Sequence, residues 1–398
     1  MRKCILPRRV EAAVKKIPFL AIIAVALAPS VRAELEVTAR HLVTIGYPIP
    51  APNQPALGDL IFAQGFAWIA TPGGLYRADL PLTNDSIVEL VAFPGLTISD
   101  LEESPDGIVL TRERRTNDDG PADDPSALLT ADGGLTWIAL DGGLEECLGG
   151  SCAVLYSTEV MAPDQRIFLN AGGNVIVSDD RGATWSLLYG AKANGRIASQ
   201  ACYAPTFELI DSRLFIGGEC PLDVAYIISG ELDETGTAWV ADPQPVNLPD
   251  LENRKIQFIW HRQETDEVYA GIEGALLRSE DRGGSFDFIY FTTGDDPKYP
   301  YIGTMLIPVG RPDFILAGGF DKAGGGAWLA ASEDHGDTWK DLSGLLPVSG
   351  HPEDEVLFLE QSPEGEIIAG FYDATERTLS LYELGIDTPS RRRAVGRR

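Results

Sequence analysis

The sequence predicts an all-β fold: a single seven-bladed β-propeller of four-stranded blades, closed into a ring by its N-terminal strand. Three observations lead to this prediction. One turn motif recurs four times, and a second turn followed by a β-rich run recurs seven times at a spacing of about 50 residues. Between these turns lie short runs rich in β-branched and aromatic residues, bounded by Gly, Pro and Asp, with no long helical period.

The first repeat reads [ST]-x-D-x-G-x-[TS]-[WF]. Its four full copies are TADGGLTW (130–137), SDDRGATW (178–185), SEDRGGSF (279–286) and SEDHGDTW (332–339). A degraded copy, DETGTAW (233–239), fills the double-width gap between the second and third, and LYRADLP (75–81) is weaker still. The residues expected to build the four turns are Asp132, Trp137, Asp180, Trp185, Asp281, Phe286, Asp334 and Trp339.

The residue types explain the turn. Asp and Ser/Thr oxygens bond backbone N–H groups that a tight turn leaves unpaired. The Gly permits a positive φ, and the aromatic residue begins the next strand and buries a large ring. We therefore expect the motif to join the third and fourth strands of a blade, with a structural rather than a catalytic Asp. His335, inside the last copy, is expected to be an exposed loop residue.

This motif resembles the Asp box, the bacterial neuraminidase repeat of sialidases, sortilin-type receptors, some glucanases and photosystem-assembly-factor propellers. The resemblance implies a propeller in which the boxes serve the scaffold. Sialidases also carry a Phe/Tyr-Arg-Ile-Pro motif near the N-terminus. This chain has YPIP at 47–50, with Pro48 in the place of the arginine, and that departure argues against sialidase activity.

The second repeat sets the number of blades. It begins with QGFAWIA (64–70) and continues as SPDGIVL (104–110), APDQRIFL (162–169), IDSRLFI (210–216), TDEVYAG (265–271), RPDFILAG (311–318) and SPEGEIIAG (362–370). Seven turns indicate seven blades. The last blade has no fourth strand of its own, so we expect LEVTARHLVT (35–44) to supply it and to remove an exposed sheet edge.

The N-terminus has the pattern of an export signal. Basic residues precede the apolar run IPFLAIIAVALA (17–28), and SVRA follows it. We predict cleavage after Ala33 and a secreted or periplasmic protein; the alternative, a membrane anchor, is disfavoured because the run is short for a bilayer span. The predicted organisation is a signal peptide (1–33), the propeller (34–386) and a disordered basic tail (387–398).

Four cysteines remain after the predicted cleavage: Cys147, Cys152, Cys202 and Cys220. An even number in an exported chain predicts two disulfides, with three connectivities available. A hairpin turning at 211 would bring Cys202 opposite Cys220, which favours the pairs 202–220 and 147–152. The rival interpretation is metal binding, but the spacing fits no zinc template and the four histidines are scattered.

The net charge of −27 argues against nucleic acid or anionic membranes as partners. The segment NDDGPADD (117–124) offers clustered oxygens for Ca²⁺, but it lacks the spacing of an EF-hand loop and a solvated acidic loop is the favoured interpretation. No nucleophile elbow, P-loop, dinucleotide motif or HExxH motif occurs. We therefore predict neither a metal nor a cofactor.

On this topology the boxes and the first-to-second-strand turns share one face, and the longer loops lie on the other. The longest is TRERRTNDDGPADDPS (111–126), and long loops tend to hold binding sites. The candidate binding residues are Tyr299, Tyr301, Phe320, Phe371, Tyr372 and Arg112; the alternative is that they only cover the ring. The sequence thus favours a monomeric, non-enzymatic scaffold for a protein or glycan, with a glycoside hydrolase, sialidase-like or glucanase-like, using paired carboxylates at the channel mouth as the alternative.

Overall fold

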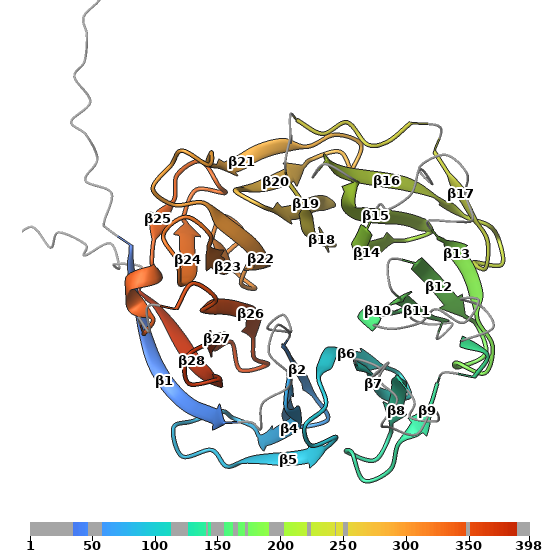
Figure 1. The fold of residues 1–398 in the computed structure, drawn as a ribbon, viewed down its shortest axis with the longest axis horizontal. Coiled ribbons are helices and arrows are strands. Elements are labelled where there is room, and N and C mark those ends of the chain that lie inside the picture. The colour runs from blue at the N-terminus through green and yellow to red at the C-terminus, as the bar shows by residue number, and fades with distance from the viewer. Residues whose placement is uncertain are drawn as a thin grey trace, which may run out of the picture. The chain divides into compact units, whose positions relative to one another are not determined.

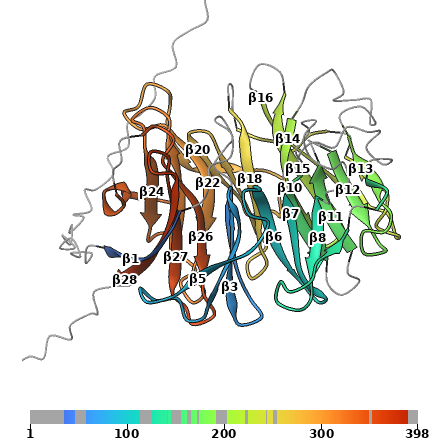
Figure 2. The ribbon, with the colours of Figure 1, turned by 60° about the horizontal axis from the view of Figure 1, so that its bottom comes forward.

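The computed structural model describes residues 35–46, 58–112, 126–140, 142–144, 155–161, 166–171, 174–190, 203–220, 224–242, 244–249, 254–347 and 351–387. Glu36 to Asp387 form one compact unit of seven four-stranded sheets arranged in a ring (Figure 1). This confirms the predicted fold class. In each sheet the strands are antiparallel, and they run between the two faces of the ring (Figure 2).

Each blade consists of four strands that follow one another from the axis of the ring outward. In blade order they are β2 (Asp59–Ala63), β3 (Phe66–Thr71), β4 (Gly74–Asp79) and β5 (Val88–Ala92); β6 (Ile98–Ser104), β7 (Gly107–Arg112), β8 (Ala127–Thr130) and β9 (Ile138–Ala139); β10 (Leu155–Met161), β11 (Arg166–Ala171), β12 (Asn174–Ser178) and β13 (Ser186–Tyr189); β14 (Tyr203–Ile210), β15 (Arg213–Cys220), β16 (Val224–Leu232) and β17 (Trp239–Ala241); β18 (Ile256–Arg262), β19 (Glu267–Ile272), β20 (Ala275–Ser279) and β21 (Asp287–Phe291); β22 (Pro300–Leu306), β23 (Ile315–Asp321), β24 (Ala327–Ser332) and β25 (Lys340–Asp341); and β26 (Glu355–Gln361), β27 (Ile367–Asp373), β28 (Thr378–Asp387) and β1 (Glu36–Gly46).

The ring is closed by the N-terminal strand, as predicted. β1 pairs antiparallel with β28, from Glu36 opposite Asp387 to Gly46 opposite Thr378. Its side chains alternate, and Leu42 and Ile45 enter a core that also contains strands of blades 1 and 7. The two ends of the described chain therefore hold each other in one sheet, and blade 7 has a complete fourth strand.

The middle strands of the blades read as continuous apolar runs because both of their faces are covered. β19 and β7 are buried along their whole length, and Trp68 on β3 and Trp328 on β24 are among the largest fully buried side chains. Each core cluster joins neighbouring blades, such as Phe168 of blade 3 with Leu214 of blade 4. Blade-on-blade packing therefore supplies the burial that a single sheet lacks.

The first-to-second-strand turns lie where the second repeat predicted them, for example at 64–65, 105–106, 211–212 and 263–266. These turns and the third-to-fourth-strand turns emerge on one face, which we call the box face. The opposite face, the loop face, holds the second-to-third-strand connections and the connections between blades, including the short 3-10 helix η1 (Ser343–Leu345). Within the described ranges, no helix is long and apolar enough to cross a bilayer.

Several predictions fall outside the described residues. These are the signal peptide, the basic tail, YPIP (47–50), NDDGPADD (117–124) and the cysteines Cys147, Cys152 and Cys202. Cys220 is the last residue of β15. Both disulfides, the cleavage site and the calcium alternative therefore stay predictions.

Candidate functional site

The box turns form closed hydrogen-bond networks between the third and fourth strands. The Asp180 carboxylate accepts bonds from Thr184 N (2.8 Å), Thr184 Oγ1 (2.6 Å) and Ser178 Oγ (2.9 Å), while Gly182 N donates to Ser178 Oγ (2.7 Å). The bonds from the Thr184 hydroxyl and amide are the main causes that lower the pKa of Asp180. The same pattern recurs at Asp132, Asp281 and Asp334.

The box aromatics pack inward, where the sequence predicted a buried ring. The Trp185 indole N–H donates to Leu140 O (2.9 Å), and that of Trp339 donates to Ile289 O (2.7 Å). Phe286 is buried, and Trp137 lies edge-on to Phe93 at 5.2 Å. These rings reach the neighbouring blade, so they stiffen the junction between blades.

The residue before the box glycine adopts a left-handed conformation and reaches the turn of the preceding blade. Arg181 (φ 60°), in the box of blade 3, forms an ion pair with Asp106 of blade 2 at 2.9 Å. Arg282 (φ 57°) lies at the equivalent position in the box of blade 5 and forms an ion pair with Asp211 of blade 4. His335 (φ 59°) lies 3.0 Å from the hydroxyl of Tyr269. His335 was expected to be an exposed loop residue; it lies in the box loop, but its side chain is only 32% exposed because its ring is held against Tyr269 and Glu267 of blade 5.

We expect Asp180→Ala to lower the free energy of unfolding by about 2 kcal/mol, because three bonds to one carboxylate are lost. Urea denaturation followed by tryptophan fluorescence measures the change. Asp179→Ala, an exposed neighbour in the same turn, is the matched control and should change it by no more than about 0.5 kcal/mol. Equal effects of the two variants would show that the network does not stabilise the blade.

On the loop face, the structure brings three of the predicted aromatics together between blades 5 and 6. Tyr301 on β22 and Phe320 on β23 lie opposite each other and stack, with ring centroids 4.7 Å apart and planes at 11°. The Lys322 ammonium lies 5.2 Å from the Tyr301 centroid. Tyr299 precedes the same strand, and its ring lies against the backbone of Gly274, where a Cβ would come within 2.5 Å of it.

A second cation–aromatic stack adjoins the first. The Arg254 guanidinium lies between Phe291 (4.6 Å) and Tyr299 (5.6 Å). It donates to Glu273 O and to Thr292 O, both at 2.8 Å, which fixes its plane. Phe291 is 48% exposed, although it is a large apolar residue.

Glu273 links the two stacks. It is buried, and its carboxylate accepts a bond from Lys322 Nζ at 2.5 Å. Burial, reinforced by a hydrogen bond with Glu273, raises the pKa of Tyr301. We call the set Arg254, Glu273, Phe291, Tyr299, Tyr301, Phe320 and Lys322 the loop-face cluster.

Other predicted binding residues lie elsewhere. Phe371, inside β27, is only 1% exposed, and Arg112, the last residue of β7, is only 3% exposed and lies over the Phe93 ring. Both predictions are wrong, because each residue belongs to a strand that neighbouring blades cover. Tyr372 packs against the core of blades 7 and 1 and keeps a partly exposed side chain. The sequence did not single out Arg254, Glu273, Phe291 or Lys322.

Carboxyl groups from four blades gather around the axis of the ring. They are Asp59 on β2, Glu102 on β6, Glu208 on β14 and Glu360 on β26, and we call them the axial carboxyls. The carboxyls also interact electrostatically. The charges of Asp59 and Glu103 raise the pKa of Glu102, and the charge of Glu102 raises the pKa of Glu208. The charges of Asp59 and Glu102 raise the pKa of Glu360. Burial is the largest cause, and it raises the pKa of Glu102, Glu208 and Glu360 to about 8 each.

Two of the axial carboxyls also accept hydrogen bonds from backbone N–H groups on the innermost strand of the next blade. Asp59 accepts bonds from Leu60 N (2.8 Å) and from Leu101 N of the next blade (2.9 Å). Glu208 accepts one from His261 N (3.2 Å). Burial is also the largest cause acting on Asp59 and raises its pKa, so the set favours protonated carboxyls near neutral pH. Among the described residues, however, no three Asp, Glu, His or Cys side chains are placed to hold a metal ion.

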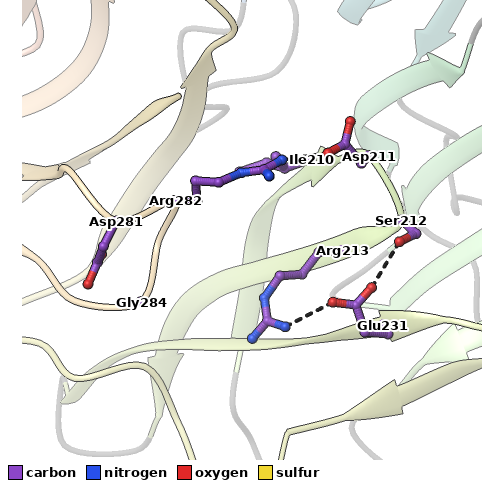
Figure 3. Close-up of a pocket in the computed structure, with 8 residues that line it drawn as sticks. All are labelled: Ile210, Asp211, Ser212, Arg213, Glu231, Asp281, Arg282 and Gly284. Atoms are coloured by element: carbon purple, nitrogen blue, oxygen red, sulfur yellow. Dashed lines mark hydrogen bonds and ion pairs between the residues drawn. The ribbon is translucent and has the colours of Figure 1, made fainter. Parts of the chain in front are cut away.

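A cavity of about 450 Å³ lies on the box face between blades 4 and 5 (Figure 3). The residues that line it are Ile210, Asp211, Ser212, Arg213, Glu231, Asp281, Arg282 and Gly284. They come from the β14–β15 turn, from β16 and from the box of blade 5. In Figure 3, Arg213 and Ser212 point toward Glu231, while Arg282 points toward Asp211.

The fold and these surfaces define the class of the protein as a seven-bladed β-propeller. The sequence matches no protein-family model and none of the curated proteins. Among solved structures it is similar to a chain of the mitotic checkpoint complex, with a TM-score of 0.52 and 12% identity over 96% of this chain and 99% of that one. This similarity shows the fold alone.

Two longer proteins are also similar. The extracellular domain of BT4673 from B. thetaiotaomicron matches over 86% of this chain with a TM-score of 0.50 and 11% identity. An ancestral GH74 enzyme matches over 82% of it with a TM-score of 0.53 and 12% identity. The chain spans only 40% and 47% of the length of these two proteins.

Proposed function

We propose that the protein is an exported, non-enzymatic scaffold that binds a protein partner on its loop face through the loop-face cluster. The observation that supports this most is the composition of the cluster. It combines three partly exposed aromatic rings, an exposed phenylalanine and the exposed cation Lys322, and aromatic residues are enriched among those that dominate the binding energy of protein interfaces. Arg254, which is only 7% exposed, packs against two of these rings.

The cluster is also rigid before any partner arrives. Arg254 is fixed by two backbone carbonyls, and Lys322 by the buried Glu273. A partner would therefore meet side chains that have already lost most of their conformational freedom, which lowers the entropic cost of binding. A chain of the mitotic checkpoint complex has a similar fold, so a ring of this kind can be part of a protein assembly.

The test compares the predicted mature protein with Phe291→Ala/Tyr299→Ala in affinity capture from the medium or periplasm of the producing cells, followed by mass spectrometry. We expect the double variant to reduce capture of the partner at least tenfold, because two rings of the cluster are lost. Leu135→Ala/Val309→Ala, which truncates two exposed apolar residues elsewhere, is the matched control and should not reduce it. A glycan array run beside it tests a sugar ligand.

Equal capture by the wild type and the cluster variant would contradict the proposal. The milder Phe291→Ala alone separates binding from folding, since its ring is half exposed and its loss should leave the melting temperature unchanged within about 2 °C. A glycan signal that the cluster variant loses would move the proposal from a protein to a sugar partner.

A glycoside hydrolase is the second candidate, and the axial carboxyls are the observation that favours it. Such enzymes need one protonated and one ionised carboxyl flanking the bond. Glu102, whose pKa is raised to about 8, would be the protonated member, and its electrostatic neighbour Asp59, which accepts two backbone N–H bonds although burial raises its pKa as well, would be the other. Release of nitrophenol from aryl glycosides that Glu102→Gln abolishes would support this function, and no release across a broad panel would exclude it.

A further inference from the structure

We propose that the outer edge of β1 is a dimer interface, at which residues 36–41 pair antiparallel with the same residues of a second copy of this chain. The pairing joins the seventh blades of the two copies into one continuous sheet. This inference goes beyond the proposed function, which concerns the loop face, and it replaces the monomer that the sequence favoured. The length of β1, its open edge and the order of its charges each support it.

β1 is a long edge strand compared with the others in this ring. It spans 11 residues, whereas the outermost strands of the other blades, β5, β9, β13, β17, β21 and β25, span only 2 to 5. Short edge strands are one way in which proteins avoid pairing with other chains, and six blades follow it. Blade 7 does not, because its outermost strand also has to close the ring.

The edge of β1 that faces away from β28 is open. β1 is the last strand of its sheet and lies on the outer rim of the ring (Figure 1). Within the described residues, the backbone of Glu36–Gly46 forms hydrogen bonds to no element other than β28. The helix η1 lies near β1 in Figures 1 and 2, but its hydrogen bonds stay within blade 6. Since alternate residues of an edge strand point their N–H and C=O groups outward, a further strand can be added here.

The charges of β1 are self-complementary about Thr38, which favours a second copy as the added strand. Glu36, Thr38 and Arg40 are exposed, and the β-bulge of the strand lies beyond them. When two copies pair antiparallel about Thr38, Glu36 of each faces Arg40 of the other. A register centred on Arg40 would instead place two like charges opposite each other.

Glu36 also needs such a cation. Arg40 forms an ion pair with Glu383 of β28, whereas among the described residues no cation lies within ion-pair distance of Glu36. Opposite charges placed across a strand pair stabilise it. The two-fold axis of the dimer provides this contact twice, because the same surface is used by both copies.

The test is analytical ultracentrifugation of the protein purified from the medium or periplasm of the producing cells, in about 0.15 M salt to screen repulsion between the acidic bodies. We expect a dimer with a dissociation constant on the order of 10 µM, because a single strand pair makes a small interface. Amide hydrogen exchange in residues 36–41 should slow as the protein is concentrated, since their outward N–H groups become bonded.

Charge-reversal variants test the register. Glu36→Lys and Arg40→Glu should each weaken dimerisation about tenfold or more, because each places like charges opposite each other across the strand pair. An equimolar mixture of the two variants should restore the dimer, since every charge of one variant then faces its opposite on the other. Glu89→Lys makes the same change of charge on β5, an edge strand of blade 1, and should dimerise as the wild type does.

A wild-type protein that stays monomeric at about 200 µM would overturn the proposal. A mixture of the two charge-reversal variants that is no more dimeric than its components would overturn it too, and this result does not depend on either variant alone. Dimers of Phe291→Ala/Tyr299→Ala as stable as those of the wild type would keep the interface distinct from the loop-face cluster, whereas their loss would place the interface on the loop face and reject β1.

Discussion

Replacing both Leu42 and Ile45 with alanine is expected to lower the free energy of unfolding by roughly 5 kcal/mol, because each truncation of a buried aliphatic side chain costs about 2–5 kcal/mol. Both residues lie on β1 and are buried in the core shared by blades 1 and 7. Since folded domains are typically stable by only about 5–15 kcal/mol, this change should bring the ring close to unfolding. Urea denaturation followed by circular dichroism measures it.

The matched control is Thr38→Ala/Arg40→Ala on the same strand. Both residues are exposed, and the Arg40–Glu383 ion pair lies at the surface, so the control should cost no more than about 1 kcal/mol. A large effect of the core variant with a small effect of the control shows that closure depends on burial by β1. Equal and small effects would mean that the other strands hold the ring without β1.

The scaffold could be predicted from the sequence because its chemistry is local and repeated. Each box keeps its Ser/Thr, Asp, Gly and aromatic residue within eight positions, and the bonds of Asp180 reach no further than four residues along the chain. The seven turns have the same property. Closure could be predicted as well, because the last blade was one strand short and one strand-like segment had no blade.

The loop-face cluster could be predicted only in part. Tyr299, Tyr301 and Phe320 were singled out as aromatics near long loops, but one partner cation, Arg254, and the carboxylate that holds Lys322, Glu273, lie in other segments. Arg254 meets Phe291 across 37 positions of the chain only after blade 5 has folded. Lys322 meets Glu273 across a junction between blades, and no local pattern marks such a pair.

The errors at Phe371 and Arg112 have one physical cause. Each belongs to the second strand of its blade, which both neighbouring blades cover, although each lies beside a loop in the sequence. The axial carboxyls were missed for a related reason. Glu208 stands between apolar residues and Glu102 stands in the polar strand ISDLEES, and each looks like an ordinary solvent-facing strand position until the ring places that strand at its axis.

The stability of the protein is expected to fall as the pH rises from about 5.5 to 9. Burial raises the pKa of Glu102, Glu208 and Glu360 to about 8 in the folded state, against 4.5 for an ordinary glutamate. Between these values the folded protein holds more protons than the unfolded chain, so the free energy of unfolding decreases with pH across this window. The side chains are partly exposed, so we expect roughly 1 kcal/mol for each.

Differential scanning calorimetry should therefore show a melting temperature roughly 5 °C or more lower at pH 9 than at pH 5.5. Glu102→Gln/Glu360→Gln should raise the melting temperature at pH 9 and flatten the pH profile, because an amide stays neutral at both ends. Glu103→Gln, an exposed neighbour on β6, should leave the profile as steep as in the wild type. A profile that both variants leave unchanged would show that the axial carboxyls are ionised at neutral pH and that their mutual repulsion costs the ring little.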